Sequence, residues 1–133
     1  LPTVTNLPGN VSFEEFTPKL GIEYKASDDA FFFASYSQGF RAGGFNGRLI
    51  RPQPNVPTYA PDTNDTYEVG FKTDWLDRRL RVNGTLFYSE YQDIQQTIVD
   101  PAVQFRVANA GDAVLKGFEL ETVIVPVDGF RID

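Results

Sequence analysis

The feature that most constrains this chain is an alternation of apolar and polar side chains that recurs in segments of similar length. In the first segment, Leu20, Ile22 and Tyr24 alternate with Lys19 and Glu23. Successive side chains of a β-strand point to opposite faces, so this pattern predicts a strand that lies between an apolar and a polar environment. The segments that the pattern predicts to be strands are 17–25, 30–37, 66–75, 80–89, 115–124 and 130–133.

The connections between these segments alternate in length. Short turns centre near Ser27, Asp77 and Asp128, whereas two long connections, which we expect to be irregular, cover roughly 38–64 and 99–112. In an antiparallel meander, this order places every tight turn at one end of the sheet and every long loop at the other. Bacterial outer-membrane barrels are built in this way, with spanning strands of about 9–11 residues. We therefore expect an all-β, up-and-down antiparallel sheet of about five to six strands.

The composition excludes several classes of function. The chain of 133 residues has 12 Lys and Arg against 18 Asp and Glu, a net charge of −6, which is unfavourable for nucleic-acid binding. It has no Cys and no His, which excludes disulfide scaffolds, thiol nucleophiles, histidine metal sites and the Ser-His-Asp triad. We expect no enzymatic activity, no catalytic residue, no metal site and no directly bound cofactor. Because Met is also absent, we expect a processed chain or a fragment.

The first long connection carries the candidate binding residues. It is rich in Gly and Pro and has no periodicity, and long irregular segments of compact proteins are often functional. Arginines attract anionic groups and aromatic rings stack on them, which favours capture of an anionic ligand. In the alternative, Phe40 and Arg41 only anchor the end of a strand. The candidate substrate-binding residues are Arg41, Phe45, Asn46, Arg48 and Tyr59.

Aromatic residues gather near the ends of the predicted strands. Phe40 and Tyr67 lie near the long connections, as does Tyr88, and further aromatics lie beside the short turns. Two aromatic girdles at the membrane interfaces are typical of outer-membrane barrels, although packing in a sandwich core gives the same pattern. The candidate membrane-interface aromatics are Tyr24, Trp75, Tyr88 and Phe130.

Three glycines interrupt the polar faces of the strands. Gly21, Gly70 and Gly117 each replace a polar side chain in the alternation. They leave room for a second domain to approach the sheet, or they mark a bend or bulge that curves it.

Five runs of sequence, in this order and at this spacing, resemble TonB-dependent outer-membrane receptors. The resemblance covers the chain from about Phe13 to Asp133 and corresponds to a middle-to-late portion of the receptor barrel. The runs are Phe16–Tyr24, Phe33–Asn46, Tyr67–Lys72 followed by Trp75–Leu80, Leu86–Tyr91, and Asn109–Ala113 followed by Lys116–Glu121.

The resemblance implies that residues 1–133 are part of a barrel of roughly 22 strands that a separate plug domain fills. We expect the plug, the TonB-contacting segment and the C-terminal barrel strands to lie outside this chain. The resemblance also implies a bacterial outer-membrane location and energised uptake of scarce solutes such as ferric siderophores or cobalamin. The implied partners are the receptor's own plug domain, TonB and outer-membrane lipid.

Two further expectations follow from the strand pattern. An isolated segment of barrel leaves its strand edges unpaired, so we expect it to self-associate in water through those edges. A detergent-free monomer in sedimentation analysis would contradict this. The alternative to a receptor segment is a soluble β-sandwich that binds carbohydrate or another ligand, which explains the alternation but not the one-sided long connections.

Overall fold

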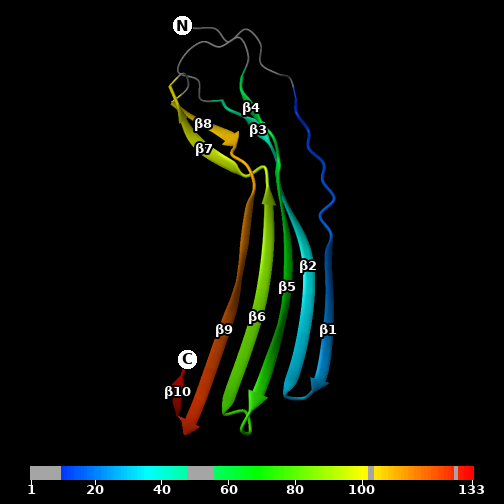
Figure 1. The fold of residues 1–133 in the computed structure, drawn as a ribbon, viewed down its shortest axis with the longest axis vertical. Helices are drawn as coiled ribbons and strands as arrows, with labels where there is room; N and C mark the ends of the chain where they lie inside the picture. Colours follow the sequence, from blue (N-terminus) through cyan, green and yellow to red (C-terminus); the bar gives the residue numbers. More distant parts are fainter. Residues whose placement is uncertain (1–9, 48–55, 102–103, 128) are drawn as a thin grey trace. The chain divides into compact units, whose positions relative to one another are not determined.

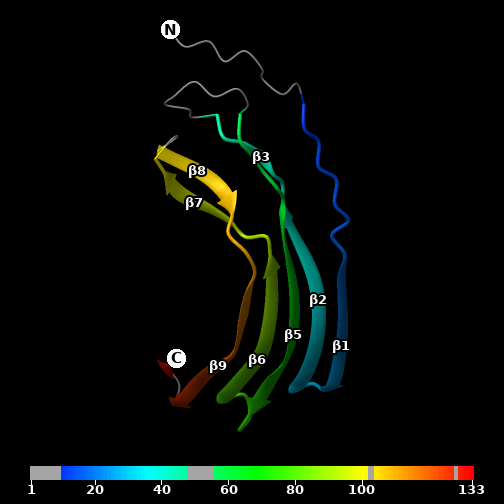
Figure 2. The ribbon, with the colours of Figure 1, turned by 45° about the horizontal axis from the view of Figure 1, so that its top comes forward.

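The computed structural model describes residues 10–47, 56–101, 104–127 and 129–133. Within these ranges the chain forms a six-stranded sheet of order β1-β2-β5-β6-β9-β10, in which each strand lies beside the next main strand along the chain (Figures 1 and 2). This is the up-and-down meander that the alternation predicts. In the described part of the chain, no helix is both long and apolar enough to cross a membrane.

The strand bounds agree closely with the predicted segments. Each main strand covers or overlaps one alternating segment, and the short connections follow at the predicted turns. The main strands are β1 (Lys19–Ser27), β2 (Ala30–Arg41), β5 (Asp62–Trp75), β6 (Leu80–Gln92), β9 (Ala113–Val127) and β10 (Phe130–Ile132). The short strands are β3 (Gly44–Phe45), β4 (Thr58–Tyr59), β7 (Gln95–Asp100) and β8 (Gln104–Asn109).

The expectation that the long connections lack regular structure is wrong for both. In 38–64, β2 continues to Arg41, β5 begins at Asp62, and β3 pairs with β4. The range 99–112 contains β8 and the end of β7, and the two strands pair antiparallel from the Gln95–Asn109 pair onward. Backbone hydrogen bonds form this ladder whatever the side chains are. Because the start of β7 is polar on both faces, the sequence there shows no alternation that would predict the strand.

The chain divides into two compact units. Unit 1 comprises residues 1–17, 39–64 and 91–113, and unit 2 comprises residues 18–38, 65–90 and 114–133. The main part of the six-stranded sheet belongs to unit 2, and the β3–β4 and β7–β8 pairs belong to unit 1.

Unit 2 is a single sheet with one apolar face. The β1–β2 register pairs Ile22 with Ala34 and Tyr24 with Phe32, which places these side chains on the same face. That face has no apolar layer against it within the described part of unit 2, and Ile22 and Phe118 are each 76% exposed. A sandwich would bury these side chains in a shared core, so the structure does not support the soluble β-sandwich alternative.

Aromatic rings cover three glycines of the sheet. The ring of Phe33 lies against Gly70, where a Cβ atom would come within 2.6 Å of the Phe33 Cζ atom. Phe87 covers Gly117 on the same polar face with a corresponding distance of 2.8 Å, and Phe71 covers Gly84 on the apolar face at 2.6 Å. These glycines therefore make room for a ring from the neighbouring strand, an explanation that the alternation did not indicate.

Substitution of Gly70 tests this arrangement. A Cβ atom at Gly70 would also lie 2.5 Å from the backbone oxygen of Gly84, so Gly70→Ala forces the backbone or the Phe33 ring to shift. We expect a loss of about 1–3 kcal/mol of stability in the full-length protein, measured by urea unfolding in detergent.

Gly21→Ala is the matched control. Its Cβ atom would lie 3.9 Å from the Ala34 oxygen, which is ordinary contact, so the change should be within about 0.5 kcal/mol. Equal stability of the two variants would show that the rings do not depend on the glycines.

Candidate functional site

The end of β2 and the start of β5 are joined by an ion pair in unit 1. The Arg41 guanidinium forms a two-pronged contact with the Asp62 carboxylate, and its Nε atom lies 3.1 Å from Asp62 Oδ2. Partial burial raises the pKa of the Asp62 carboxyl, but hydrogen bonds from Arg41 and from the Gln95 amide outweigh it, so this pKa lies below its ordinary value. Arg41 is thus held at the strand end, while its side chain remains 58% exposed.

Gln95, at the start of β7, contacts both ends of the first long connection. Its side-chain Nε2 lies within hydrogen-bond distance of the backbone oxygens of Ala60 at 3.0 Å, Ala42 at 3.1 Å and Arg41 at 3.3 Å. Its backbone N–H donates to Asp62 Oδ2 at 3.1 Å. A residue at the start of β7 therefore holds both ends of the first long connection.

Two asparagines make further links within unit 1. Asn46 is buried, donates to the Val107 oxygen at 2.9 Å and accepts from the Val107 N–H at 2.7 Å. Asn109 accepts from the Ala60 N–H at 2.8 Å and donates to the Asp93 oxygen at 2.7 Å. An asparagine amide has a donor and an acceptor, as a backbone peptide does, so each side chain bonds to main-chain groups as a neighbouring strand would.

The structure places four of the five candidate substrate-binding residues in unit 1. Phe45 and Tyr59 are half-buried in the β3–β4 pair, and Asn46 follows directly. Arg41 lines a hollow with Phe40, Asp62, Tyr91 and Ile94. The fifth candidate, Arg48, lies outside the described residues.

The residues that organise this unit were not among the candidates. Asp62, Gln95 and Asn109 act through contacts with residues far away in sequence, and no local pattern marks them. Within the described ranges, the acidic side chains form no group of three that could hold a metal ion.

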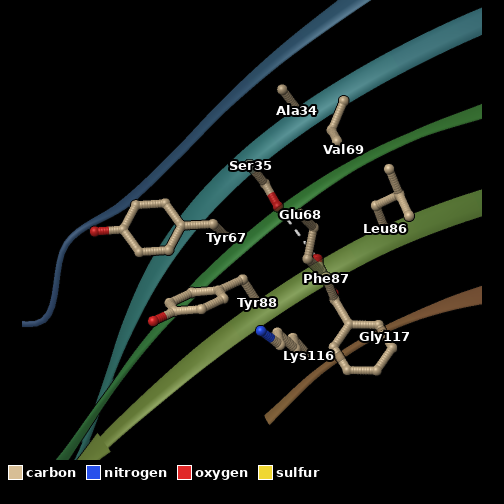
Figure 3. Close-up of a pocket in the computed structure, with 10 residues that line it drawn as sticks. All are labelled: Ala34, Ser35, Tyr67, Glu68, Val69, Leu86, Phe87, Tyr88, Lys116 and Gly117. Atoms are coloured by element: carbon tan, nitrogen blue, oxygen red, sulfur yellow. Dashed lines mark hydrogen bonds between the residues drawn. The ribbon is translucent and has the colours of Figure 1, made fainter. Parts of the chain in front are cut away.

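In unit 2, three tyrosines form a row across neighbouring strands on the apolar face, and Figure 3 shows two of them, Tyr67 and Tyr88. The rings of Tyr36 and Tyr67 lie 5.0 Å apart, and those of Tyr67 and Tyr88 lie 6.5 Å apart, between centroids. The Tyr36 hydroxyl donates to Asp65 Oδ1 at 2.6 Å. Tyr88 was expected at an interface, and Tyr36 and Tyr67 complete its row.

The other interface candidates lie toward the short turns. Tyr24 and Trp75 share the apolar face, and Trp75 donates its indole N–H to Thr73 Oγ1 at 2.9 Å. Phe130, after the last turn, is exposed. From Tyr67 to Trp75 the strand rises about 26 Å, at about 3.3 Å per residue, close to the height of the apolar band of outer-membrane barrels.

The apolar face between these two levels carries no charge among the described residues of the main strands. Its side chains come from β1, β2, β5, β6 and β9, and the opposite face carries the charged ones. The apolar set includes Ile22, Phe32, Val69, Phe71, Val82, Leu86, Phe118 and Leu120.

Polar contacts tie the strands together on the other face. Asp74 binds Arg81 at 2.8 Å, Ser35 donates to Glu68 at 3.2 Å, and Thr66 lies 3.0 Å from Ser89 between hydroxyl oxygens. This face therefore suits a hydrated interior, while the apolar face suits hydrocarbon.

Known proteins resemble this chain in sequence. Over 110 residues the chain is 32% identical to the probable TonB-dependent siderophore receptor PiuA of Acinetobacter baumannii, which covers 78% of this chain and 14% of that protein. It is 28% identical to the metal-pseudopaline receptor CntO of Pseudomonas aeruginosa, over 79% of this chain and 14% of that one. It is 27% identical to the ferric-pyoverdine M114 receptor PbuA of Pseudomonas sp. strain M114, over 89% of this chain and 14% of that protein.

A solved structure has the same fold. The crystal structure of the ferric yersiniabactin uptake receptor FyuA from Yersinia pestis matches 86% of this chain and 16% of its own, with a TM-score of 0.69 and 23% sequence identity. The chain thus spans 14% of the length of the curated relatives named above. Residues 2–129 match the family described as TonB dependent receptor-like, beta-barrel, and the chain belongs to that family.

Proposed function

We propose that the protein containing this chain takes up a ferric siderophore or a related metal chelate across the bacterial outer membrane. The observation that carries the proposal is the charge-free apolar band between two levels of aromatic side chains, backed by a polar face. Such a sheet suits the wall of a barrel with lipid on one side and water on the other. The substrate class is supported by the relatives, which are named as receptors for siderophores and metal chelates.

The proposal includes partners that this chain does not contain. A wide barrel needs a plug, and uptake against a gradient needs energy, which receptors of this family draw from TonB. Residues 1–133 would then supply a segment of the wall and two of its long loops, and the protein acts as a transporter rather than an enzyme. Self-association of the isolated chain through its strand edges stays a prediction.

Within this proposal, unit 1 is a preorganised capture surface. Its two long connections are held by backbone-directed hydrogen bonds from Asn46, Gln95 and Asn109. Preorganised loops lose less conformational entropy when a ligand binds, which favours affinity. Phe45 and Tyr59 remain the candidates for stacking on the chelate. Arg41 remains the candidate for binding the negative charge of the chelate.

Uptake by the full-length protein tests the proposal directly. A strain lacking the receptor gene, complemented with that gene, should take up iron from at least one ferric siderophore under iron limitation, and uptake should stop without TonB. The measurement is accumulation of radioactive iron over a panel of chelates. A receptor that reaches the outer membrane but transports no metal chelate would contradict the proposal.

The link at Gln95 makes a separate prediction about loop order. Gln95→Ala removes the donors to three backbone oxygens, so residues 42–47 and 56–61 should exchange amide hydrogen at least tenfold faster in the full-length receptor. Gln96→Ala, at an exposed position on the same strand, is the control and should leave exchange unchanged. Equal exchange in both variants would show that Gln95 does not order the loop.

Arg41 either binds an anionic ligand or only anchors the end of its strand, and separate substitutions of Arg41 and of its partner Asp62 distinguish these two roles. Asp62→Asn removes the acid of the ion pair and leaves the guanidinium available, whereas Arg41→Gln removes the positive charge itself. If Arg41 contacts an anionic chelate, Arg41→Gln should weaken binding about tenfold more than Asp62→Asn, measured by quenching of intrinsic fluorescence. Equal losses in the two variants would leave Arg41 as a strand anchor alone.

A further inference from the structure

One cation lies on the apolar face of unit 2, and the function above does not use it. In the alternation of β9, Lys116 lies on the same face as Phe118 and Leu120. Among the described outward-facing residues of the main strands, it is the one with a positive charge. A charged side chain facing hydrocarbon is costly, which makes its placement informative.

The register of β6 and β9 places Lys116 in the tyrosine row. Asn83 donates to Glu121 at 2.8 Å, and the Val125 N–H donates to the Arg79 oxygen at 2.8 Å. The Phe87 ring lies against Gly117. These three pairs belong to one antiparallel register, in which Lys116 is opposite Tyr88.

The row therefore reads Tyr36, Tyr67, Tyr88 and Lys116 across four neighbouring strands. Tyr67, Tyr88 and Lys116 line one shallow groove, whose floor includes Val69 and Leu86 (Figure 3). The groove is apolar along its floor and cationic at one side. Aromatic rows mark the level at which a membrane passes from hydrocarbon to headgroups.

The ammonium of Lys116 is available to a ligand. It has no hydrogen bond or ion pair with another residue in the described part of the chain. The nearest acidic residues on this face are Asp65 and Glu90, which lie one level beyond the tyrosine row. Asp65 accepts a hydrogen bond from the Tyr36 hydroxyl, and Glu90 is exposed. A free cation beside phenol rings, at the depth of the headgroups, complements a phosphate that is attached to an acyl chain.

We infer that this groove binds a phosphorylated lipid of the surrounding leaflet, with the acyl chain against Val69 and Leu86 and the phosphate at Lys116. The occupant is a lipid headgroup rather than free phosphate, because the groove joins an apolar floor to the cation. The inference rests on the proposed function for the membrane around the sheet, but it concerns the outer surface of the wall and not the substrate.

The test uses the full-length receptor in nanodiscs of phosphatidylcholine that contain a minor fraction of phosphatidic acid. Native mass spectrometry should show retained phosphatidic acid on the wild type, and Lys116→Gln should weaken this binding about fivefold. Lys116→Arg keeps the charge and should retain the lipid, which also shows that the position tolerates substitution.

Lys19→Gln is the matched control. Lys19 precedes Leu20, which pairs with Tyr36, so it lies at the level of the tyrosine row but on the opposite face of the sheet. Its loss should leave lipid retention unchanged. Glu90→Gln removes the nearest exposed acid and should leave retention unchanged or raise it.

Three results would overturn the inference. They are equal retention by the wild type and Lys116→Gln, equal loss in Lys116→Gln and Lys19→Gln, and displacement of the lipid by inorganic phosphate at matched concentration. Failure of the proposed function is distinguishable, because it appears as absence from the outer-membrane fraction or as lack of chelate uptake. Neither of those measurements depends on lipid retention in nanodiscs.

Discussion

The structure depends on lateral pairing of strands, because a backbone N–H or C=O without a partner is costly in hydrocarbon. In lipid each such group costs several kcal/mol, and the side chains of a lipid-facing sheet offer no replacement partners. The register of β1 with β2 and the successive order of the main strands meet this demand along the inner part of the sheet. The lipid-facing side chains are then free to be apolar, and the opposite face is free to be polar.

A sheet of this kind has little core to fix its register, so other contacts must do so. Of the described hydrophobic residues, Val56 alone is buried, and it belongs to unit 1. In unit 2, aromatic rings lie against glycines of neighbouring strands, and pairs such as Asp74 with Arg81 join strands on the polar face. A slip of one residue would place rings over side chains and charges toward lipid, so these local contacts specify one alignment.

The sequence predicted the strands of unit 2 well because their side chains meet two different environments. Alternation placed Leu20, Ile22 and Tyr24 on one face, and the structure confirms it. It left the direction of Phe31 and Phe33 undecided, since both faces of that stretch are apolar, and the register places them with Lys25 and Glu23.

The candidate site was less predictable from the sequence. Arg41 is fixed by Asp62 and also contacts the Gln95 oxygen, and Asn46 is fixed by Val107, so each partner lies far away in sequence. The start of β7 is polar on both faces, so no alternation marks it. The turn after Trp75 was predicted, but not its backbone. Leu76, Asp77 and Arg78 all have positive φ, although none is glycine, at about 1–2 kcal/mol each.

The ties within unit 1 are directed at main-chain atoms. Gln95 contacts the oxygens of Ala42 and Ala60, and Asn46 contacts the peptide groups of Val107. The identity of the side chain at each of those partner positions therefore does not affect the bond. A frame built in this way tolerates exchange of its solvent-facing residues, so the surface of these loops is able to diverge in sequence while its scaffold stays the same.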